Sequence, residues 1–585
     1  MASEELVTEQ FQFFGIEVPK EVIHKCVSLC EEYNIDAESF IEQWMAYSLN
    51  KLNGSAPNLD NLQTFARKEF SKRATNRSVV PGSENGQVDI SSNLTVYGAY
   101  APIQYPFILC AHSTCYDFVI KVKVENESTN NQLNVLSPAT YSPIVGSSKY
   151  ASRNNSGVVL HSYGDETLLQ KIAVPCGPND VLNLKITQVP NDDGEIYTKA
   201  MFGFELLHEK ASTFDSNIRY ISQTIIKKFD IKDVASVRHK TQTEVAVSGR
   251  IECDADARLN PKSVILQGAW DQSLSQTVPV ELDNVKQYCL FPGQTVVMKG
   301  VNPRGDKFIA NEVFYDASLP PPDHNEDMMN MLNGTMSMVI SSGPYTTSDN
   351  MTYEPLKDLV TYINTHKPHT VIMTGPFLDS DHVKVKDNSM AETYRSFYEK
   401  LLDSLGDINN TSPYTKIYIV SSSKDAFHVN IYPTPAYTSR RKRANIHFVP
   451  DPCTLKINGV LVGVTSTDIL MHMGQEEISF GMAGDKLSRL AGHVLMQQTY
   501  YPLWPAPSTL AVDANLWTAH AQLSRTPHIL ILPSNFRYFI KDVNGSVVVN
   551  PEHLTKGTGG GTFARVLLSN EKDKDLKISA QIVRI

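Results

Sequence analysis

Apolar residues recur at helical spacing through the first part of the chain. The clearest group comprises Val22, Ile23, Cys26, Leu29 and Cys30. Similar groups begin at Phe11, Phe40 and Leu62, and they are separated by stretches that contain Gly, Pro or Asn. The pattern predicts an all-α helical bundle over residues 1–75. Such a bundle either docks to other proteins or has a purely structural role.

Residues 76–156 are polar and rich in Ser, Asn, Pro and Gly, which is the composition of a flexible linker. Within it, the segment 95–124 is an exception, because its apolar residues alternate in the manner of a β-strand. Ser137 and Ser142 each precede a proline, so both are minimal sites for proline-directed phosphorylation.

A third region turns from a helix to short strands. The connecting segment 157–235 ends in a helix predicted between Phe214 and Val234. Residues 236–318 contain five predicted strands, at 244–252, 263–267, 277–282, 294–300 and 308–315. Five such short strands with turns between them indicate a small closed β-barrel, the OB fold. We expect the Pro-rich stretch 319–336 to act as a stiff spacer.

Residues 337–585 show the strand, loop and helix order of an α/β domain. Buried strands are predicted at 338–341, 370–374, 416–421 and 528–533, and helices at 353–365, 392–405 and 487–498. Chemistry in such a domain belongs in the loops that follow the strands. These loops are poor in ligands, since the first has no carboxylate or imidazole before Asp349.

Composition and charge exclude several classes of protein. The formal net charge is −10, which opposes broad binding to a phosphate backbone. Eight cysteines in 585 residues are too few for a disulfide scaffold, and the Cys26/Cys30 pair is best explained as buried thiols. No uncharged apolar run reaches the ~18 residues of a membrane-spanning helix, and the first residues are acidic where a secretory signal is basic and apolar. We expect a protein of the reducing cell interior that is neither membrane-inserted nor secreted.

Several motifs together resemble the family of DNA polymerase alpha B subunits, in the same order along the chain. They are GPYTTSD at 343–349, TGPFLD at 374–379, NG at 458–459 with GVTSTD at 463–468, YYPL at 500–503, LPS at 532–534 with RYF at 537–539, and VNP at 549–551 with LTKG at 554–557. The resemblance runs from about Ser212 to Ile585, and it is weaker for the first helices and for 149–164. The strand-like segment 95–124 lies outside it.

The resemblance implies a multidomain protein in which the OB barrel packs on an inactivated domain of the calcineurin-like phosphoesterase type. A working enzyme of that type holds two metal ions with carboxylates and imidazoles on successive strand-end loops. The corresponding positions here are Ser342, Pro344, Pro376, Asp379, Ser423 and Lys424. Proline has no side-chain ligand and a lysine ammonium repels a cation. We therefore expect neither catalysis nor a metal or other cofactor.

Three further groups of residues are candidates for binding. A basic cluster comprises Arg440, Arg441, Lys442 and Arg443. It suits a nuclear localisation signal or a nucleic-acid contact, or alternatively a solvated loop. Exposed contacts for a partner protein are predicted at Arg537, Tyr538, Phe539, Asn550 and Pro551, with core positions as the alternative that the sequence leaves open. Trp270 and Tyr288 in the barrel could stack on bases, but core or subunit contacts explain them better.

These observations favour a non-catalytic regulatory subunit of the DNA polymerase alpha–primase complex, in the nucleus. The resemblance implies that the C-terminal domains bind the C-terminal region of the catalytic subunit, alongside the small and large primase subunits. The N-terminal helices would recruit other replication proteins through the long tether, with at most weak direct contact to DNA. The alternatives are a metal-dependent single-strand nuclease and an OB-fold protein that binds single-stranded DNA.

Overall fold

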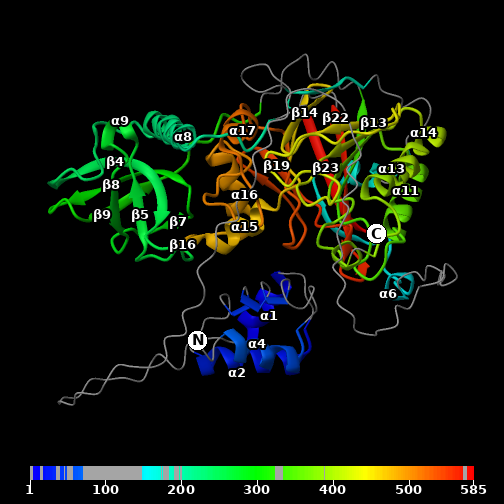
Figure 1. Cartoon of the computed structure of the whole chain (residues 1–585), viewed down its shortest axis with the longest axis horizontal. Helices are drawn as coiled ribbons and strands as arrows, with labels where there is room; N and C mark the ends of the chain where they lie inside the picture. The colour runs from blue at the N-terminus through cyan, green and yellow to red at the C-terminus, as the bar shows by residue number, and fades with distance from the viewer. Residues whose placement is uncertain are drawn as a thin grey trace, which may run out of the picture. The chain divides into compact units, whose positions relative to one another are not determined.

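The computed structural model describes residues 4–13, 18–33, 40–41, 43–44, 47–48, 57–69, 148–172, 174–175, 184–189, 197, 201–322, 334–387, 389–570 and 576–585. Figure 1 shows the helices and strands of these segments. The strand-like segment 95–124 and the predicted phosphorylation sites Ser137 and Ser142 lie outside the described residues. Within the described residues, no helix combines the length and the apolar character needed to cross a bilayer.

The N-terminal helices are amphipathic, as their apolar spacing predicts. They are α1 (Glu4–Phe13), α2 (Lys20–Tyr33) and α4 (Leu59–Glu69). Trp44 and Phe40 lie edge-on to Phe65, with ring centroids 5.5 and 5.6 Å away. Cys26 is buried, and burial raises the pKa of its thiol to about 12. The Cys26 thiol is therefore protonated at neutral pH and behaves as a small apolar side chain, as predicted.

A closed barrel follows a long helix, α8 (Leu207–Lys228). Its strands are β3 (Val234–Ala235), β4 (Thr241–Cys253), β5 (Val264–Gln267), β6 (Thr277–Glu281), β8 (Thr295–Asn302) and β9 (Phe308–Phe314). They are hydrogen-bonded in the order β3-β4-β5-β6-β9-β8, and β8 also pairs with β4, which closes the barrel. The five predicted strands are confirmed. Helix α8 begins earlier than predicted, because its first two turns have no apolar stripe that marks a buried face.

The α/β domain contains two sheets. The first has the order β1 (Val159–Tyr163), β23 (Leu576–Arg584), β22 (Thr562–Asn570), β10 (Thr335–Ser342), β11 (Thr370–Thr374), β12 (Lys416–Val420) and β13 (Ile446–Val449). The second has the order β18 (Phe539–Val543), β19 (Ser546–Asn550), β17 (Ile529–Ile531), β15 (Val460–Val464), β14 (Cys453–Ile457) and β2 (Ile186–Gln188). Strands β10 to β13 run parallel to one another.

Both faces of the first sheet are covered, which explains the uninterrupted apolar runs of its central strands. Met338 and Ile340 point into a core shared with Val462 and Ile529 of the second sheet. Val339, between them, lies in another core with residues of α11 (Glu354–His366) and α13 (Tyr394–Gly406). Sheet, sheet and helices therefore form consecutive layers.

Shorter elements and further helices complete the domain. They are α6 (Ser148–Ala151), α7 (Glu166–Lys171), α12 (Val383–Lys386), α14 (Ile408–Thr411), α15 (Ile469–Glu476), α16 (Lys486–Met496), α17 (Ala514–His520), β16 (Ile478–Phe480), β20 (Thr555–Lys556) and β21 (Gly559–Gly560), with α9 (Trp270–Ser273) and β7 (Tyr288–Leu290) in the barrel region.

The predicted linker ends earlier than residue 156. Tyr150 on α6 is buried in the core under α11, and its hydroxyl donates to Asp358 Oδ2 at 2.7 Å. Strand β1 then pairs antiparallel with β23, and β2 extends the second sheet beside β14. The domain limit at residue 337 is therefore also wrong, because residues 148–189 supply an edge strand to each sheet. Both strands are short and half-exposed, so they lack a clear alternation of apolar residues.

The Pro-rich stretch is not a free spacer where the structure describes it. The carbonyl of Pro320 accepts a hydrogen bond from Thr526 Oγ1 at 2.7 Å, and the Ala317 amide donates to the carbonyl of Met496 at 3.1 Å. Residues 317–322 therefore run along the α/β domain.

If the segment 148–153 is part of the core, removing its buried side chain will destabilise the α/β domain. We expect Tyr150→Ala to lower the free energy of unfolding by about 3 kcal/mol, because a large aromatic ring leaves a cavity. Urea unfolding measures the change. Lys149→Ala, an exposed neighbour, is the control, and equal midpoints for the two variants would show that this segment is a linker.

Candidate functional site

If the α/β domain carries out a reaction, the sequence predicts that the reacting groups lie in the loops at the carboxyl ends of β10, β11 and β12. Strand β10 ends at Ser342, and the next amide, that of Gly343, donates to the carbonyl of Thr374 at 2.9 Å. The Gly375 amide donates in turn to the carbonyl of Val420 at 3.0 Å. The three loops therefore lie side by side along this edge of the sheet, as parallel strands require.

Four of the six predicted metal positions offer no strong ligand. Pro344 and Pro376 have no ligand atom in their side chains. Ser342 and Ser423 carry neutral hydroxyls, and both residues are buried. The Ser342 hydroxyl lies 3.4 Å from Nδ1 of His553, but its burial keeps it from any substrate, so this pair does not form a nucleophile and base.

The other two predicted positions neutralise each other in part. Asp379 accepts a hydrogen bond from the Asp381 amide at 2.9 Å. Burial raises the pKa of Asp379, and the nearby Lys424 ammonium opposes this effect. Lys424 itself is exposed. One carboxylate beside an ammonium group does not fit a two-metal centre, which needs several anionic or imidazole ligands.

A buried carboxylate that the sequence patterns did not reveal joins two of these loops. Asp425 Oδ1 accepts from the amides of Phe377 at 2.8 Å and Leu378 at 2.6 Å, and Oδ2 accepts from the Tyr437 hydroxyl. Burial raises the pKa of Asp425 to about 7, against the opposing effect of these hydrogen bonds. Its oxygens are used to hold the loop after β11 against the loop after β12, and they are not directed to a ligand.

Two histidines lie near Lys424 and are neutral at physiological pH. Burial lowers the pKa of His472 to about 4, although the Asp468 carboxylate opposes this, and burial also lowers the pKa of His553. His472 Nδ1 lies 2.9 Å from the hydroxyl of Tyr501. Asp468 caps α15 and accepts from the Asn535 amide at 2.8 Å. These groups are engaged in internal hydrogen bonds.

The α/β domain has a buried ionic network where it meets the barrel. Glu477 accepts two hydrogen bonds from Arg489, at 2.8 and 2.9 Å, and lies 3.0 Å from Nε2 of His493. Cys289 on β7 lies beside them, and the ligand atoms of Cys289, Glu477 and His493 are all within 4.8 Å of one another. Both oxygens of Glu477 are occupied by nitrogen donors, so the cluster fits an ion-pair network better than a metal site.

The charges in this network stabilise one another. Burial alone would raise the pKa of Glu477, but the hydrogen bonds and charges of His493 and Arg489 lower it to about 2. Burial alone would lower the pKa of His493, but its hydrogen bonds to Cys289 and Glu477 raise it to about 9. At neutral pH the network is therefore a carboxylate between two cations.

Further hydrogen bonds join the barrel to the α/β domain on both sides of this network. Strand β16 pairs antiparallel with β7 of the barrel region. The Gln497 side chain accepts from the Thr295 amide at 2.8 Å and donates to the carbonyls of Thr295 and Tyr315 at 3.2 and 3.1 Å. Sequence patterns contain no signal for these contacts, because the partners come from separate segments and none repeats at a fixed spacing.

The predicted exposed partner contacts are mostly buried. Arg537 is exposed and Tyr538 is half-buried, but Phe539, Asn550 and Pro551 are buried. Asn550 donates to the carbonyls of Phe536 and Arg537 at 3.1 and 3.2 Å. The prediction of an exposed surface is therefore wrong for Phe539, Asn550 and Pro551, and Asn550 ties β19 to the loop before β18.

The basic cluster is exposed at Arg440, Arg441 and Lys442. Arg443 is less exposed, and its guanidinium pairs with Glu399 at 3.1 Å and with Asp403 at 2.6 Å, whereas the exposed Arg441 reaches Asp403 at 3.3 Å.

Of the two barrel residues predicted as candidates for stacking on bases, Trp270 is exposed to solvent and Tyr288 is not. Trp270 is 60% exposed, whereas Tyr288 is buried in the barrel core. Stacking on bases therefore has a single candidate in this pair.

Three family models match the chain. They describe the B subunit of DNA polymerases alpha and epsilon over residues 338–541, the OB domain of the DNA polymerase alpha B subunit over 211–316, and the N-terminal part of the DNA polymerase alpha B subunit over 4–72. The chain is also similar to curated proteins over nearly its whole length. It is 31% identical to the DNA polymerase alpha B subunit of Mus musculus and 32% identical to that of Rattus norvegicus, covering 100% of both chains in each case. It is 30% identical to that of Drosophila melanogaster, over 97% of this chain and 96% of the relative.

Removing the carboxylate of the ionic network should destabilise the junction strongly. We expect Glu477→Gln to cost about 3 kcal/mol of unfolding free energy, because it leaves Arg489 and His493 buried without their anion. The matched control is Glu312→Gln, which removes the same charge from an exposed pair with Lys299 at 3.7 Å and should cost under about 0.5 kcal/mol. Similar urea midpoints for both variants would contradict this account of the network.

The contribution of His493 should depend on pH. Its folded pKa of about 9 lies above the ordinary value of 6.5, so its stabilising effect is complete below pH 6.5 and is lost as the pH rises through 9. Cys289, Tyr315, Glu477 and Arg489 are the polar groups that face it. We expect the stability difference between the wild type and His493→Gln to fall by about 1–3 kcal/mol between pH 6 and pH 9. A difference that stays constant over this range would mean that His493 does not titrate in the folded state.

Proposed function

The chain belongs to the family of DNA polymerase alpha B subunits, and from this premise we propose that it is the non-catalytic regulatory subunit of a polymerase alpha–primase complex. The observation that carries the proposal is the composition of the strand-end edge. Among its six predicted metal positions, Asp379 is the single carboxylate, and Lys424 stands beside it. Polymerisation and primer synthesis then belong to the partner subunits.

The α/β domain is, in this proposal, an inactivated domain of the calcineurin-like phosphoesterase type. Two sheets packed face to face, with helices outside, support this assignment. The internal use of Asp425, whose oxygens accept from two amides and a hydroxyl, gives the edge a structural role that needs no metal.

The barrel and the α/β domain together would form the platform that binds the C-terminal region of the catalytic subunit. The hydrogen bonds of Gln497 and the pairing of β16 with β7 support a rigid platform, because relative rotation of the two domains would leave buried amides unpaired. The small and large primase subunits join through the complex. The N-terminal helices would recruit other replication proteins.

In this role the protein would act in the nucleus. The exposed cations Arg440, Arg441 and Lys442 would serve as the localisation signal, with Arg443 fixing the loop through its acidic partners. Phosphorylation of Ser137 and Ser142 would add charge near the tether.

Purification of the tagged chain from its own cells tests the proposal. We expect a large polymerase subunit and two primase subunits to accompany it in equal amounts, as measured by quantitative mass spectrometry. Recovery of the chain without a polymerase would contradict the proposal. So would Mn²⁺-dependent hydrolysis of single-stranded DNA by the isolated chain that Asp379→Ala abolishes, since this result would identify a nuclease.

A further inference from the structure

Five large apolar side chains are exposed within seven consecutive residues, where the chain enters helix α8. They are Met201, Phe202, Phe204, Leu206 and Leu207. Met201, Phe204 and Leu207 are 84%, 76% and 88% exposed, respectively. Single exposed apolar residues are ordinary on a protein surface, but such a concentration marks an interaction surface. We call residues 201–207 the apolar segment.

Hydrogen bonds hold the backbone of the apolar segment against the start of α17. The Gly203 amide donates to Asp513 Oδ2 at 3.1 Å. Two positions further on, Glu205 Oε2 accepts from the Ala514 amide at 2.7 Å. The backbone is therefore fixed while the apolar side chains face solvent, so a partner that binds there has little chain to order.

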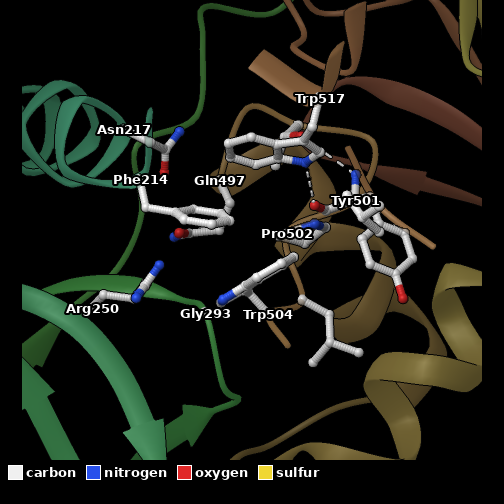
Figure 2. A pocket seen from close by; sticks show the side chains of 12 residues that line it. Phe214, Asn217, Arg250, Gly293, Gln497, Tyr501, Pro502, Trp504 and Trp517 are labelled. Carbon is white, nitrogen blue, oxygen red and sulfur yellow. Dashed lines mark hydrogen bonds between the residues drawn. The ribbon is translucent and has the colours of Figure 1, made fainter. Parts of the chain in front are cut away.

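Helix α8, which continues the apolar segment, is itself anchored to the α/β domain. The ring of Phe214 lies 4.4 Å from that of Trp504 and 5.8 Å from that of Trp517, measured between centroids (Figure 2). Lys210 Nζ lies 4.9 Å from the centre of the Trp504 ring. Leu207 stands three residues before Lys210 on the same helix, so these contacts also fix the position of Leu207. The exposed side chains thus stand on rigid support.

Carboxylates outnumber cations around the apolar segment. The described residues 201–219 and 513–520 contain four carboxylates but only two Lys or Arg side chains. Both cations are already paired, Lys210 with Glu205 and Arg219 with Asp215. Two carboxylates in these ranges therefore have no Lys or Arg partner in the described part of the chain, and Glu209 on α8 is one of them.

Glu209 is the carboxylate that an incoming partner meets beside the apolar side chains. Hydrogen bonds from the Leu206 amide at 3.0 Å and from the Asn515 side chain at 3.4 Å lower its pKa, so it is ionised at neutral pH. A phosphate backbone or an anionic lipid surface is repelled by this charge. A peptide that carries Lys or Arg next to its apolar residues is attracted instead.

The size of the apolar segment favours one helix of a partner over a second copy of this chain. Its exposed side chains present on the order of 600 Å², since a large side chain offers roughly 150–250 Å². Two such segments placed face to face would bury about 1,200 Å², less than the roughly 2,000 Å² or more of a permanent homodimer. A single amphipathic helix, with apolar residues every three or four positions, covers a patch of this size.

We propose that the apolar segment and the first turn of α8 bind an amphipathic helix of a partner protein. The apolar face of that helix covers Phe204 and Leu207, and its Lys or Arg side chains lie beside Glu209. The inference goes beyond the proposed function, because it assigns a surface and the chemistry of its occupant and does not require the occupant to be a polymerase subunit.

Fluorescence anisotropy with the full chain tests the proposal. The probe is a short, labelled amphipathic helix of Leu and Lys, used at about 0.15 M salt, where charges more than about 8 Å apart are largely screened. We expect it to bind with a Kd in the micromolar range. One comparison peptide has the same composition in a shuffled order that forms no apolar face, and the other carries Glu in place of Lys. Each should bind at least about fivefold more weakly, because each lacks one of the two features that the surface recognises.

Surface variants locate the binding site on the chain. Leu207→Ser and Phe204→Ser should each weaken binding of the Leu and Lys helix at least about fivefold, through the lost apolar contact. Leu274→Ser, an exposed leucine of the barrel, is the matched control and should leave binding unchanged. Glu209→Gln should weaken binding about twofold, whereas Glu312→Gln, which removes an exposed carboxylate of the barrel, should not. These side chains lie at the surface, so the variants should fold like the wild type.

Three results would overturn the proposal. Leu207→Ser and Leu274→Ser could bind the helix equally well, or the shuffled peptide could bind the wild type as tightly as the amphipathic one. The chain alone could also sediment as a dimer that Leu207→Ser dissociates, which would identify a second copy as the occupant. Since the test uses the isolated chain, its failure is distinct from a failure to recover the polymerase subunits.

Discussion

The pairing of β16 with β7, together with the hydrogen bonds of Gln497 to Thr295 and Tyr315, is the constraint that fixes the barrel on the α/β domain, and a buried network of Glu477, Arg489 and His493 supports it from the α/β side. A buried carboxylate without partners costs several kcal/mol, so this arrangement is stable only when all three side chains meet. Their meeting holds the residue before β16 against α16, so that β16 presents the edge with which β7 pairs. The ring contacts of Phe214 with Trp504 and Trp517 depend on the same register of β16 and β7, because Phe214 belongs to α8, whereas both tryptophans belong to the α/β domain.

A second constraint is that the α/β domain closes with segments far apart in the sequence. Strand β23, at the end of the described chain, lies between β22 and β1, so the first sheet is complete only when residues near 160 and 580 pair. Tyr150 and Arg153 then cover the core beside α11, where both contact Asp358. The segment before the barrel is therefore a structural part of the domain that follows the barrel, and the barrel is an insertion between two parts of one domain.

Strands with a strong pattern could be predicted from the sequence, and contacts between distant segments could not. The barrel strands alternate apolar and polar residues, and β10 to β12 are apolar throughout because both their faces are covered. Strand β2 has only three residues and β1 is half-exposed, so neither gives a periodic signal. The shortage of metal ligands at the strand-end edge could be predicted from the residue types alone. The roles of Asp425 and of the Glu477 network could not be predicted in this way, because they depend on burial and on partners elsewhere in the chain. The apolar spacing of 537–551 was compatible with either surface or core, and the prediction of surface was wrong for three of five residues.

The strand-end edge and the contact between α8 and the α/β domain are connected through Tyr501. Its hydroxyl contacts Nδ1 of His472 near Lys424, and its carbonyl accepts from Trp517 Nε1, whose indole lies against Phe214 of α8 (Figure 2). Tyr501 is buried, and its ring lies 5.3 Å from that of Tyr432, so neither contact can move without the other. Asp425 adds a further internal tie at this edge, because it holds the loop after β11 against the loop after β12. Buried side chains therefore keep the strand-end edge and the α8 contact in one rigid arrangement.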